Sequence, residues 1–202
     1  AHLGQRFVDP RLGCGTAYHS GVVGRYVIEE WARITCEPDI ASEWIYRNPV
    51  LSKDTLVVGI SQSGESRDTV QAVRLAREGG APTVAITNLM GTQITREVDR
   101  VLYTRAGLET AVAASKTFTA QVTLLYLLAL KLAQVRKTLP EAEIEALLAE
   151  VQSLPAKAAS KRSVFAIAYS SPGSCRPRRS VALGTSSDQR GERGDRGLGQ
   201  EL

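Results

Sequence analysis

Three serines lie within the six-residue segment Ser61-Gln62-Ser63-Gly64-Glu65-Ser66. Their hydroxyl groups can donate hydrogen bonds to an anion, and Gly64 allows the backbone to approach a ligand closely. The residues that follow are apolar at helical spacing, and the first turn of a helix offers backbone N–H groups without partners and a positive dipole end. The segment therefore predicts a phosphate-binding loop. The alternative is that the serines only cap the helix.

Two common phosphate ligands are disfavoured by the sequence around this loop. It contains no Gly-Lys-Ser or Gly-Lys-Thr, so it is not a nucleoside-triphosphate loop. It contains no G-x-G-x-x-G motif, so a dinucleotide is also disfavoured. We therefore expect the ligand to be a small phosphorylated metabolite.

The segments around the loop alternate between strand and helix. The β-branched run Leu56–Ile60 predicts a buried parallel strand before it, and Arg67–Glu78 predicts a helix after it. A further extended stretch ends at residue 40, and further strands are expected at 83–87 and 100–103. Other helices are expected at 17–34, 41–47, 93–98 and 115–136. Strands separated by helices imply right-handed crossovers and a parallel sheet covered on both faces.

In such a fold the ligand lies outside the carboxyl ends of the strands. Four loops of small or hydroxyl-bearing residues should meet at that edge, at 14–17, 61–66, 88–92 and 108–116. Their convergence favours ligand binding over simple helix capping.

Composition and charge exclude several functional classes. The chain has 202 residues, a hydrophobic fraction of 43% and a formal net charge of +4, with acidic and basic residues interspersed, so no nucleic acid is expected. Three widely spaced cysteines without a CxxC motif are typical of reduced thiols in the cytoplasm. The two histidines lack ligand spacing, so no metal or other cofactor is expected. The longest apolar run, 122–133, is shorter than the roughly 20 residues of a membrane span, so we expect a cytoplasmic protein without a membrane.

Four separated segments together resemble a known family. These are CGTAYHSG from Cys14, IASEWIYR from Ile40, SQSGES from Ser61 and ETAVAASK from Glu109. In order and spacing they resemble the sugar isomerase (SIS) domain family. Within it they are most similar to the first SIS domain of the isomerising glutamine–fructose-6-phosphate aminotransferases, which make glucosamine 6-phosphate.

The resemblance implies an α/β fold, a three-layer αβα sandwich with a flavodoxin-like, five-stranded parallel sheet, in a homodimeric protein. It implies fructose 6-phosphate or glucosamine 6-phosphate as the bound molecule. Carried over position by position, Ser61, Gln62, Ser63 and Ser66 match the phosphate loop, and Thr16 and Val112 match positions beside the sugar. Gly64, Glu109, Ser115 and Lys116 are further candidates for ligand contact.

Two positions depart from the family pattern. The family usually carries serine where this chain has Ala17 and Ala114, which weakens the expected sugar contacts. The neighbouring Ser115 points about 100° away along a helix and does not replace the missing hydroxyl. Glu65 is expected to cap the start of the helix that follows the loop rather than to catalyse.

The family's catalytic groups are not recognisable in this chain. The resemblance implies a glutaminase cysteine, a carboxylate base, a histidine and an imine-forming lysine, and places them outside the matched region. We therefore expect no catalytic residue, and a truncated fragment that is inactive alone. Two alternatives remain: a glucosamine-6-phosphate deaminase with two SIS domains, towards which the segment 113–117 leans, and a sugar-phosphate-sensing SIS module of a regulator.

The two ends of the chain do not fit the family. Residues 1–12 form an irregular segment, because Asp9, Pro10 and Arg11 make a poor strand. The SIS domain is expected at 13–137, followed by a helix and linker at 138–162. Residues 163–168 look like the first strand of another domain, and 163–202 as a whole form an aberrant Arg/Gly/Ser-rich tail expected to be disordered. We interpret both ends as non-homologous sequence joined to an intact domain, as a reading-frame error would produce.

Overall fold

The computed structural model describes residues 9–110 and 114–170. Contacts divide the chain into two compact units, Ala1–Lys157 and Ala158–Leu202. The fold that positions the candidate site lies in the first unit.

The centre of this unit is a five-stranded, wholly parallel sheet with the order β2-β1-β3-β4-β5. This is the flavodoxin-like order, in which the chain reverses direction across the sheet between β1 and β3. The strands are β1 (Asp9–Gly13), β2 (Cys36–Ile40), β3 (Val57–Ser61), β4 (Thr83–Thr87) and β5 (Arg100–Tyr103). The α/β fold class expected from the sequence is confirmed.

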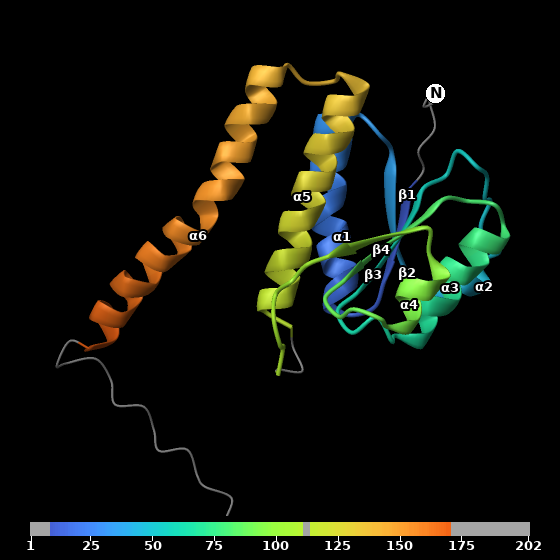
Figure 1. The fold of residues 1–202 in the computed structure, drawn as a ribbon, viewed down its shortest axis with the longest axis horizontal. Helices are drawn as coiled ribbons and strands as arrows, with labels where there is room; N and C mark the ends of the chain where they lie inside the picture. The colour runs from blue at the N-terminus through green and yellow to red at the C-terminus, as the bar shows by residue number, and fades with distance from the viewer. Residues whose placement is uncertain (1–8, 111–113, 171–202) are drawn as a thin grey trace, which may run out of the picture. The chain divides into compact units, whose positions relative to one another are not determined.

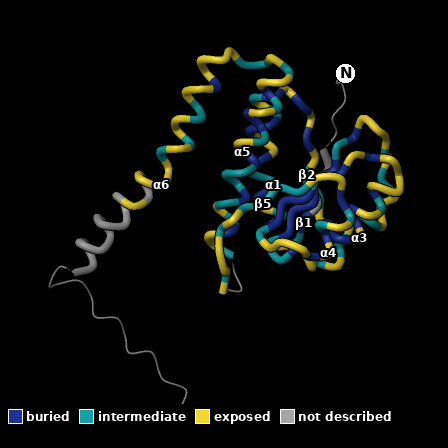
Figure 2. The backbone as a smooth tube through the Cα atoms, viewed as in Figure 1, coloured by how far each residue is buried: buried dark blue, intermediate teal, exposed yellow. Residues whose placement is uncertain are grey.

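Helices cover both faces of the sheet and make it the middle of three layers (Figure 1). On one face lie α1 (Thr16–Val27) and α5 (Lys116–Arg136), and on the other α2 (Ala41–Tyr46), α3 (Arg67–Glu78) and α4 (Gln93–Glu97). The strands β3 and β4 are largely buried between them (Figure 2).

Alternate side chains of β3 pack into two different hydrophobic clusters, because successive side chains of a strand point to opposite faces of the sheet. Val58 and Ile60 pack with Leu125 of α5. Val57 packs with Trp44 of α2 and residues of α3. All five residues of β3 are buried, which explains why the run is apolar without alternation.

The absence of a side chain at Gly59 lets α3 approach β3 closely. A Cβ atom at this position would lie 2.5 Å from Cγ1 of Val73. The close approach fixes the start of α3 directly beside the end of β3, where the serine segment connects them.

Helix α5 is the one helix in the described parts of the chain that is long and apolar enough to span a membrane, with a mean hydropathy of 1.4. In the fold it covers one face of the sheet beside α1, and Leu125, Ala129 and Leu130 are buried there. The packing of the sandwich thus accounts for the apolar residues on the buried face of α5.

The expectation of a poor strand before Gly13 is wrong, because β1 spans Asp9–Gly13 and lies inside the sheet. It pairs with β2 along its whole length, from Asp9 opposite Cys36 to Gly13 opposite Ile40. Its pairing with β3 begins only at Arg11, so Pro10 lies where β1 has a partner on one side. Hydrogen bonds from two neighbouring strands outweigh the weak local preference.

Two helical expectations also need correction. The first predicted helix, 17–34, is divided into α1 and the π-helical turn η1 (Ile28–Ala32), which ends at Arg33 in a left-handed conformation. The last helix, α6 (Glu141–Ser170), continues through the residues expected to be a strand at 163–168 and through the expected linker. The part of the tail at 171–202 lies outside the described residues.

Candidate functional site

The loop between Ser61 at the end of β3 and Arg67 at the start of α3 is held by hydrogen bonds among its own residues. The hydroxyl oxygen of Ser61 accepts a hydrogen bond from the backbone N–H of Gly64 at 3.1 Å, and lies 3.0 Å from the hydroxyl oxygen of Ser66. The hydroxyl oxygen of Ser63 accepts from the N–H of Glu65 at 3.2 Å. We call residues 61–66 the serine loop.

These contacts argue against the helix-capping alternative. Ser66 is the N-cap residue of α3, but its side chain makes no capping hydrogen bond to the helix. Its carbonyl oxygen accepts the ordinary backbone bond from the N–H of Val70 at 2.9 Å. The serine hydroxyls therefore leave the positive end of α3 open for an anion.

Gly64 is the one position in the loop that no other residue could occupy unchanged. Its φ angle is +69°, and a Cβ atom there would lie 2.1 Å from the Thr92 hydroxyl oxygen. The carbonyl oxygens of Gln62 and Gly64 accept hydrogen bonds from the N–H groups of Asn88 and Ile94, at 3.1 and 3.0 Å. The segment that follows β4 thus supports the serine loop from behind.

The carboxylate of Glu65 has a different partner from the one expected. It accepts a hydrogen bond at 2.9 Å from the backbone N–H of Gln93, at the start of α4. The expectation that it caps α3 is wrong, because the loop turns its side chain towards the neighbouring helix. Glu65 therefore joins the serine loop to α4.

Three of the four loops that were predicted to converge line one cavity. A cavity of about 160 Å³ opens at the carboxyl ends of the strands. It is lined by Cys14, Thr16, Ala17, Ile60, Ser61, Gln62, Ser63, Ser66, Glu109, Ala114 and Gln121. Three of the loops, 14–17, 61–66 and 108–116, therefore meet in one place, while residues of 88–92 lie behind the serine loop. Because the volume is below the roughly 300 Å³ of a typical small-molecule pocket, a sugar phosphate would extend out of it.

Several predicted residues do not line this cavity. Gly64 is buried within the serine loop, against Thr92. Ser115 is the N-cap residue of α5, and its carbonyl oxygen accepts a hydrogen bond from the hydroxyl of Thr119. The ammonium group of Lys116 donates to the carbonyl oxygen of Leu108. Val112 lies outside the described residues.

Glu109 lines the cavity and also holds the first turn of α5. One of its carboxylate oxygens accepts hydrogen bonds from the backbone N–H and the hydroxyl of Thr117, at 3.2 and 3.1 Å. The backbone hydrogen bond from Thr117 is the main reason that the pKa of Glu109 lies below its ordinary value, and the charge of Lys116 adds to it. Glu109 therefore adds a negative charge to the lining of the cavity at neutral pH.

Three residues of the cavity, Cys14, Ile60 and Gln121, were not identified as site residues from the sequence. Cys14 is a free, half-buried cysteine that lines the cavity and packs against the hydrophobic cluster around Trp44. Gln121 of α5 is only 2% exposed. It follows Thr117 by four residues, and this spacing places both on one face of α5.

The groups around the cavity can bind an anion. Among the described residues that line it, Glu109 is the single carboxylate, and none is a histidine or lysine. The described parts of the chain contain no group of three or more acidic, histidine or cysteine side chains that could hold a metal ion. The cavity offers hydroxyl groups and a helix N-terminus to an anion.

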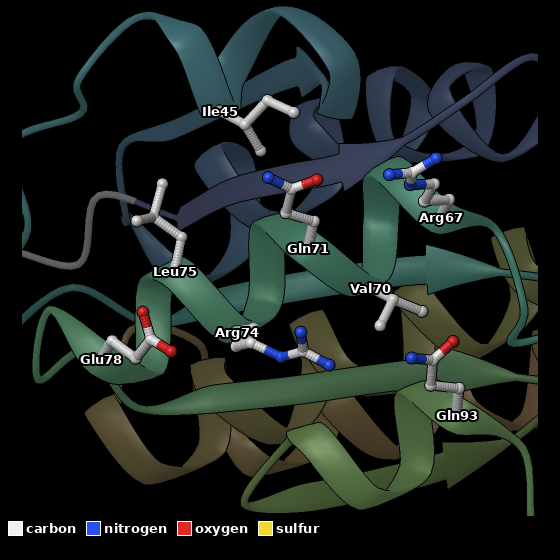
Figure 3. A pocket seen from close by; sticks show the side chains of 8 residues that line it. All are labelled: Ile45, Arg67, Val70, Gln71, Arg74, Leu75, Glu78 and Gln93. Carbon is white, nitrogen blue, oxygen red and sulfur yellow. The ribbon is translucent and has the colours of Figure 1, made fainter.

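A larger groove of about 490 Å³ lies elsewhere, between α2, α3 and α4 (Figure 3). It is lined by Ile45, Arg67, Val70, Gln71, Arg74, Leu75, Glu78 and Gln93. The Arg74 guanidinium is paired with Glu97 at 2.6 Å, and this pairing raises the Arg74 pKa. We assign the site to the smaller cavity, because none of the serine-loop hydroxyls lines the groove.

Comparison with known proteins agrees with this geometry. The family model for the SIS domain matches residues 11–131. The chain belongs to the SIS domain family. The matched segment runs from β1 into α5 and contains every described residue that lines the cavity.

The SIS domain is similar to part of a larger enzyme. Over 147 residues the chain is 52% identical to the glutamine–fructose-6-phosphate aminotransferase (isomerising) of Clostridium tetani, and over 144 residues it is 54% identical to that of Mycolicibacterium paratuberculosis. These matches cover 73% and 71% of this chain, but only 24% and 23% of the relatives. The SIS domain thus spans about a quarter of the length of these enzymes.

Solved structures of other proteins have a similar fold. The C-terminal domain of glucosamine-fructose-6-phosphate aminotransferase from Francisella tularensis superposes with a TM-score of 0.72 at 33% identity, over 75% of this chain and 43% of that one. Glucosamine-6-phosphate deaminase from Thermotoga maritima superposes with a TM-score of 0.60 at 22% identity, over 72% of this chain and 43% of that one. The second likeness shows the fold alone.

Proposed function

We propose that this SIS domain binds the phosphate group of fructose 6-phosphate or glucosamine 6-phosphate, as part of an isomerising glutamine–fructose-6-phosphate aminotransferase. The observation that carries the proposal is that Ser61, Gln62, Ser63 and Ser66 line one cavity beside the start of α3. The serine side chains leave the start of that helix uncapped. The relatives that are 50–54% identical carry the name of this enzyme.

The chemistry of the serine loop fits a phosphate dianion. Hydroxyl and backbone N–H groups that donate to an anion form charge-assisted hydrogen bonds, each worth on the order of 1.5–3 kcal/mol. A few such bonds, less the free energy lost on association, correspond to dissociation constants in the micromolar to millimolar range. This range suits a metabolite that must also be released.

We propose that the domain supplies binding and not the bond-breaking steps. The cavity holds one carboxylate, from Glu109, and that carboxylate is already engaged by Thr117. The base, histidine and lysine that the family uses would come from other parts of a longer enzyme. The deaminase alternative is supported by the sequence of the segment 113–117 and by a likeness in fold.

The homodimer and the cytoplasmic location remain proposals that rest on the family. Exposed apolar side chains on α1 and α5, such as Tyr26 at 68% and Val135 at 50%, are consistent with a surface covered by another chain. Sedimentation at several protein concentrations would test the dimer.

The decisive experiment is calorimetry with fructose 6-phosphate, fructose and inorganic phosphate. We expect fructose 6-phosphate and inorganic phosphate to bind, and fructose to bind at least about tenfold more weakly because it lacks the anion. The Ser63→Ala substitution should weaken both phosphate ligands. Ser42→Ala, whose hydroxyl contacts only the neighbouring Glu43, is the matched control. Equal affinity for fructose and fructose 6-phosphate would contradict the proposal.

A further inference from the structure

Gln121 lines the cavity and carries a buried polar atom without a partner. Its side chain is 2% exposed, and its carbonyl oxygen Oε1 has no hydrogen-bond partner among the described residues. A buried acceptor without a partner is costly in free energy, so such groups in native proteins usually have a partner when the protein works.

The position of Gln121 relates this orphan atom to the ligand. Other buried side chains also have an atom without a partner in the described parts of the chain, among them Thr69 and Thr92. Of these side chains, Gln121 is the one that lines the cavity. It projects from α5, the helix on the opposite face of the sheet from α3, so it faces the cavity from a different element than the serine loop.

The chemistry of the free atom determines what it can bind. A carbonyl oxygen accepts hydrogen bonds and cannot pair with a phosphate dianion, which is itself an acceptor. The partner must be a donor, and a sugar offers hydroxyl groups close to its phosphate. Ile60 and Ala17 line the same cavity and offer no side-chain donor.

We propose that Oε1 of Gln121 accepts a hydrogen bond from a hydroxyl group of the bound sugar, and so makes the site prefer a polyhydroxylated phosphate ester over phosphate alone. This inference rests on the proposed function of the serine loop. The two groups divide the ligand: the serine loop binds the anion, and Gln121 binds the carbon skeleton through a hydroxyl group.

The test compares two ligands on one substitution. Gln121→Met keeps the length of the side chain and removes the acceptor. We expect the dissociation constant of fructose 6-phosphate to rise about tenfold, the value of one well-placed hydrogen bond, while that of inorganic phosphate changes by less than about twofold. Gln134→Met, on the exposed side of α5 where Gln134 contacts Lys131, is the matched control and should change neither.

Two outcomes would overturn the inference. The first is unchanged affinity for fructose 6-phosphate, which would mean that water satisfies Oε1. The second is an equal loss for both ligands, which would indicate a structural role. If the Met variant fails to fold, Gln121→Leu takes its place, because it also removes the acceptor, and the same two outcomes decide.

The two proposals fail in different ways. If the unmodified chain binds neither inorganic phosphate nor fructose 6-phosphate, the proposed function itself is wrong. If the unmodified chain binds both and Ser63→Ala weakens both, but Gln121→Met changes neither, only the role of Gln121 is wrong.

Discussion

Glu109 and Thr117 are joined by two hydrogen bonds to a single carboxylate oxygen, although eight residues separate them in the chain. The bonds come from the backbone N–H and the hydroxyl of Thr117, which is fully buried in the first turn of α5. Glu109 therefore attaches the loop after β5 to the first turn of α5, the helix that carries Gln121.

Replacing Glu109 separates its structural role from its charge. Glu109→Ala removes the acceptor for both Thr117 donors and should lower the melting temperature. Glu109→Gln keeps an oxygen for them, so its melting temperature should stay closer to that of the wild type. Because the charge beside the cavity is lost in both variants, both should bind inorganic phosphate somewhat more tightly, which calorimetry would measure. Weaker phosphate binding in Glu109→Gln would show that the carboxylate does not act on the ligand by repulsion.

Ser61 and Ser63 should differ in their effect on stability. Ser61 is buried and its hydroxyl oxygen accepts the N–H of Gly64, so Ser61→Ala should lower the free energy of unfolding by about 1–2 kcal/mol. Ser63 is only half-buried, and Ser63→Ala should change that free energy by less than about 0.5 kcal/mol. Urea denaturation measures both, and calorimetry should show weaker phosphate binding in each. A loss of stability in Ser63→Ala equal to that in Ser61→Ala would contradict the assigned contacts.

Gly64→Ala should destabilise the protein by more than the strain at its positive φ angle alone would cost. The substitution places a Cβ atom into Thr92 and strains a backbone with φ of +69°, so we expect a loss of about 2–4 kcal/mol. Gly91→Ala is the matched control, because Gly91 has φ of +71° with open space around it and should lose only about 1 kcal/mol. The difference between the two denaturation midpoints measures the steric clash. Identical losses would mean that the loop moves away from Thr92 at little cost.

Asp99 should make stability depend on pH. The backbone N–H and hydroxyl of Thr83 donate to its carboxylate at 2.8 and 2.9 Å, and the backbone hydrogen bond is the main cause of a pKa below the ordinary value of 3.8. A lowered pKa in the folded state gives stability that is present above 3.8 and is lost as the pH falls through the folded-state pKa. Asp99→Asn should therefore be less stable than the wild type at pH 7, by no more than about 1 kcal/mol because the carboxylate is 43% exposed.

This difference between wild type and Asp99→Asn should shrink as the pH falls below 3.8, which thermal melts across the acidic range would follow. Asp54→Asn, in an exposed turn where the described residues give its carboxylate no partner, is the control and should leave the pH profile unchanged. A difference that persists undiminished at low pH would show that the charge of Asp99 is not responsible.

The elements around the serine loop could be predicted from the sequence because their signals are local. The bounds predicted for α3, β4 and β5 agree with the structure, since each is marked by its own apolar pattern and by glycine or polar residues at its ends. The serine loop followed from the abrupt change of a β-branched run into small polar residues. Residue types within a window of about 20 positions sufficed for these predictions.

The remaining features depend on partners far away in the chain. The strand β1 is stabilised by two neighbouring strands and not by its own residues, so its local pattern was misleading. Glu65 bonds to Gln93, 28 residues later, and nothing in the local sequence indicates that helix as its partner. The orientation of Gln121 depends on which face of α5 packs against the sheet, and this is decided only when the layers assemble.

The interior position of β1 has a consequence for shortened versions of this chain. Loss of residues 9–13 would separate β2 from the other strands of the sheet. It would also leave the edge of β3 that faces β1 with unpaired N–H and C=O groups. Exposed backbone of this kind is a template for strands of other molecules. N-terminal trimming that reaches Asp9 should thus yield self-associating material, whereas trimming that stops before Asp9 keeps the pairs that Asp9–Gly13 make with β2 and β3.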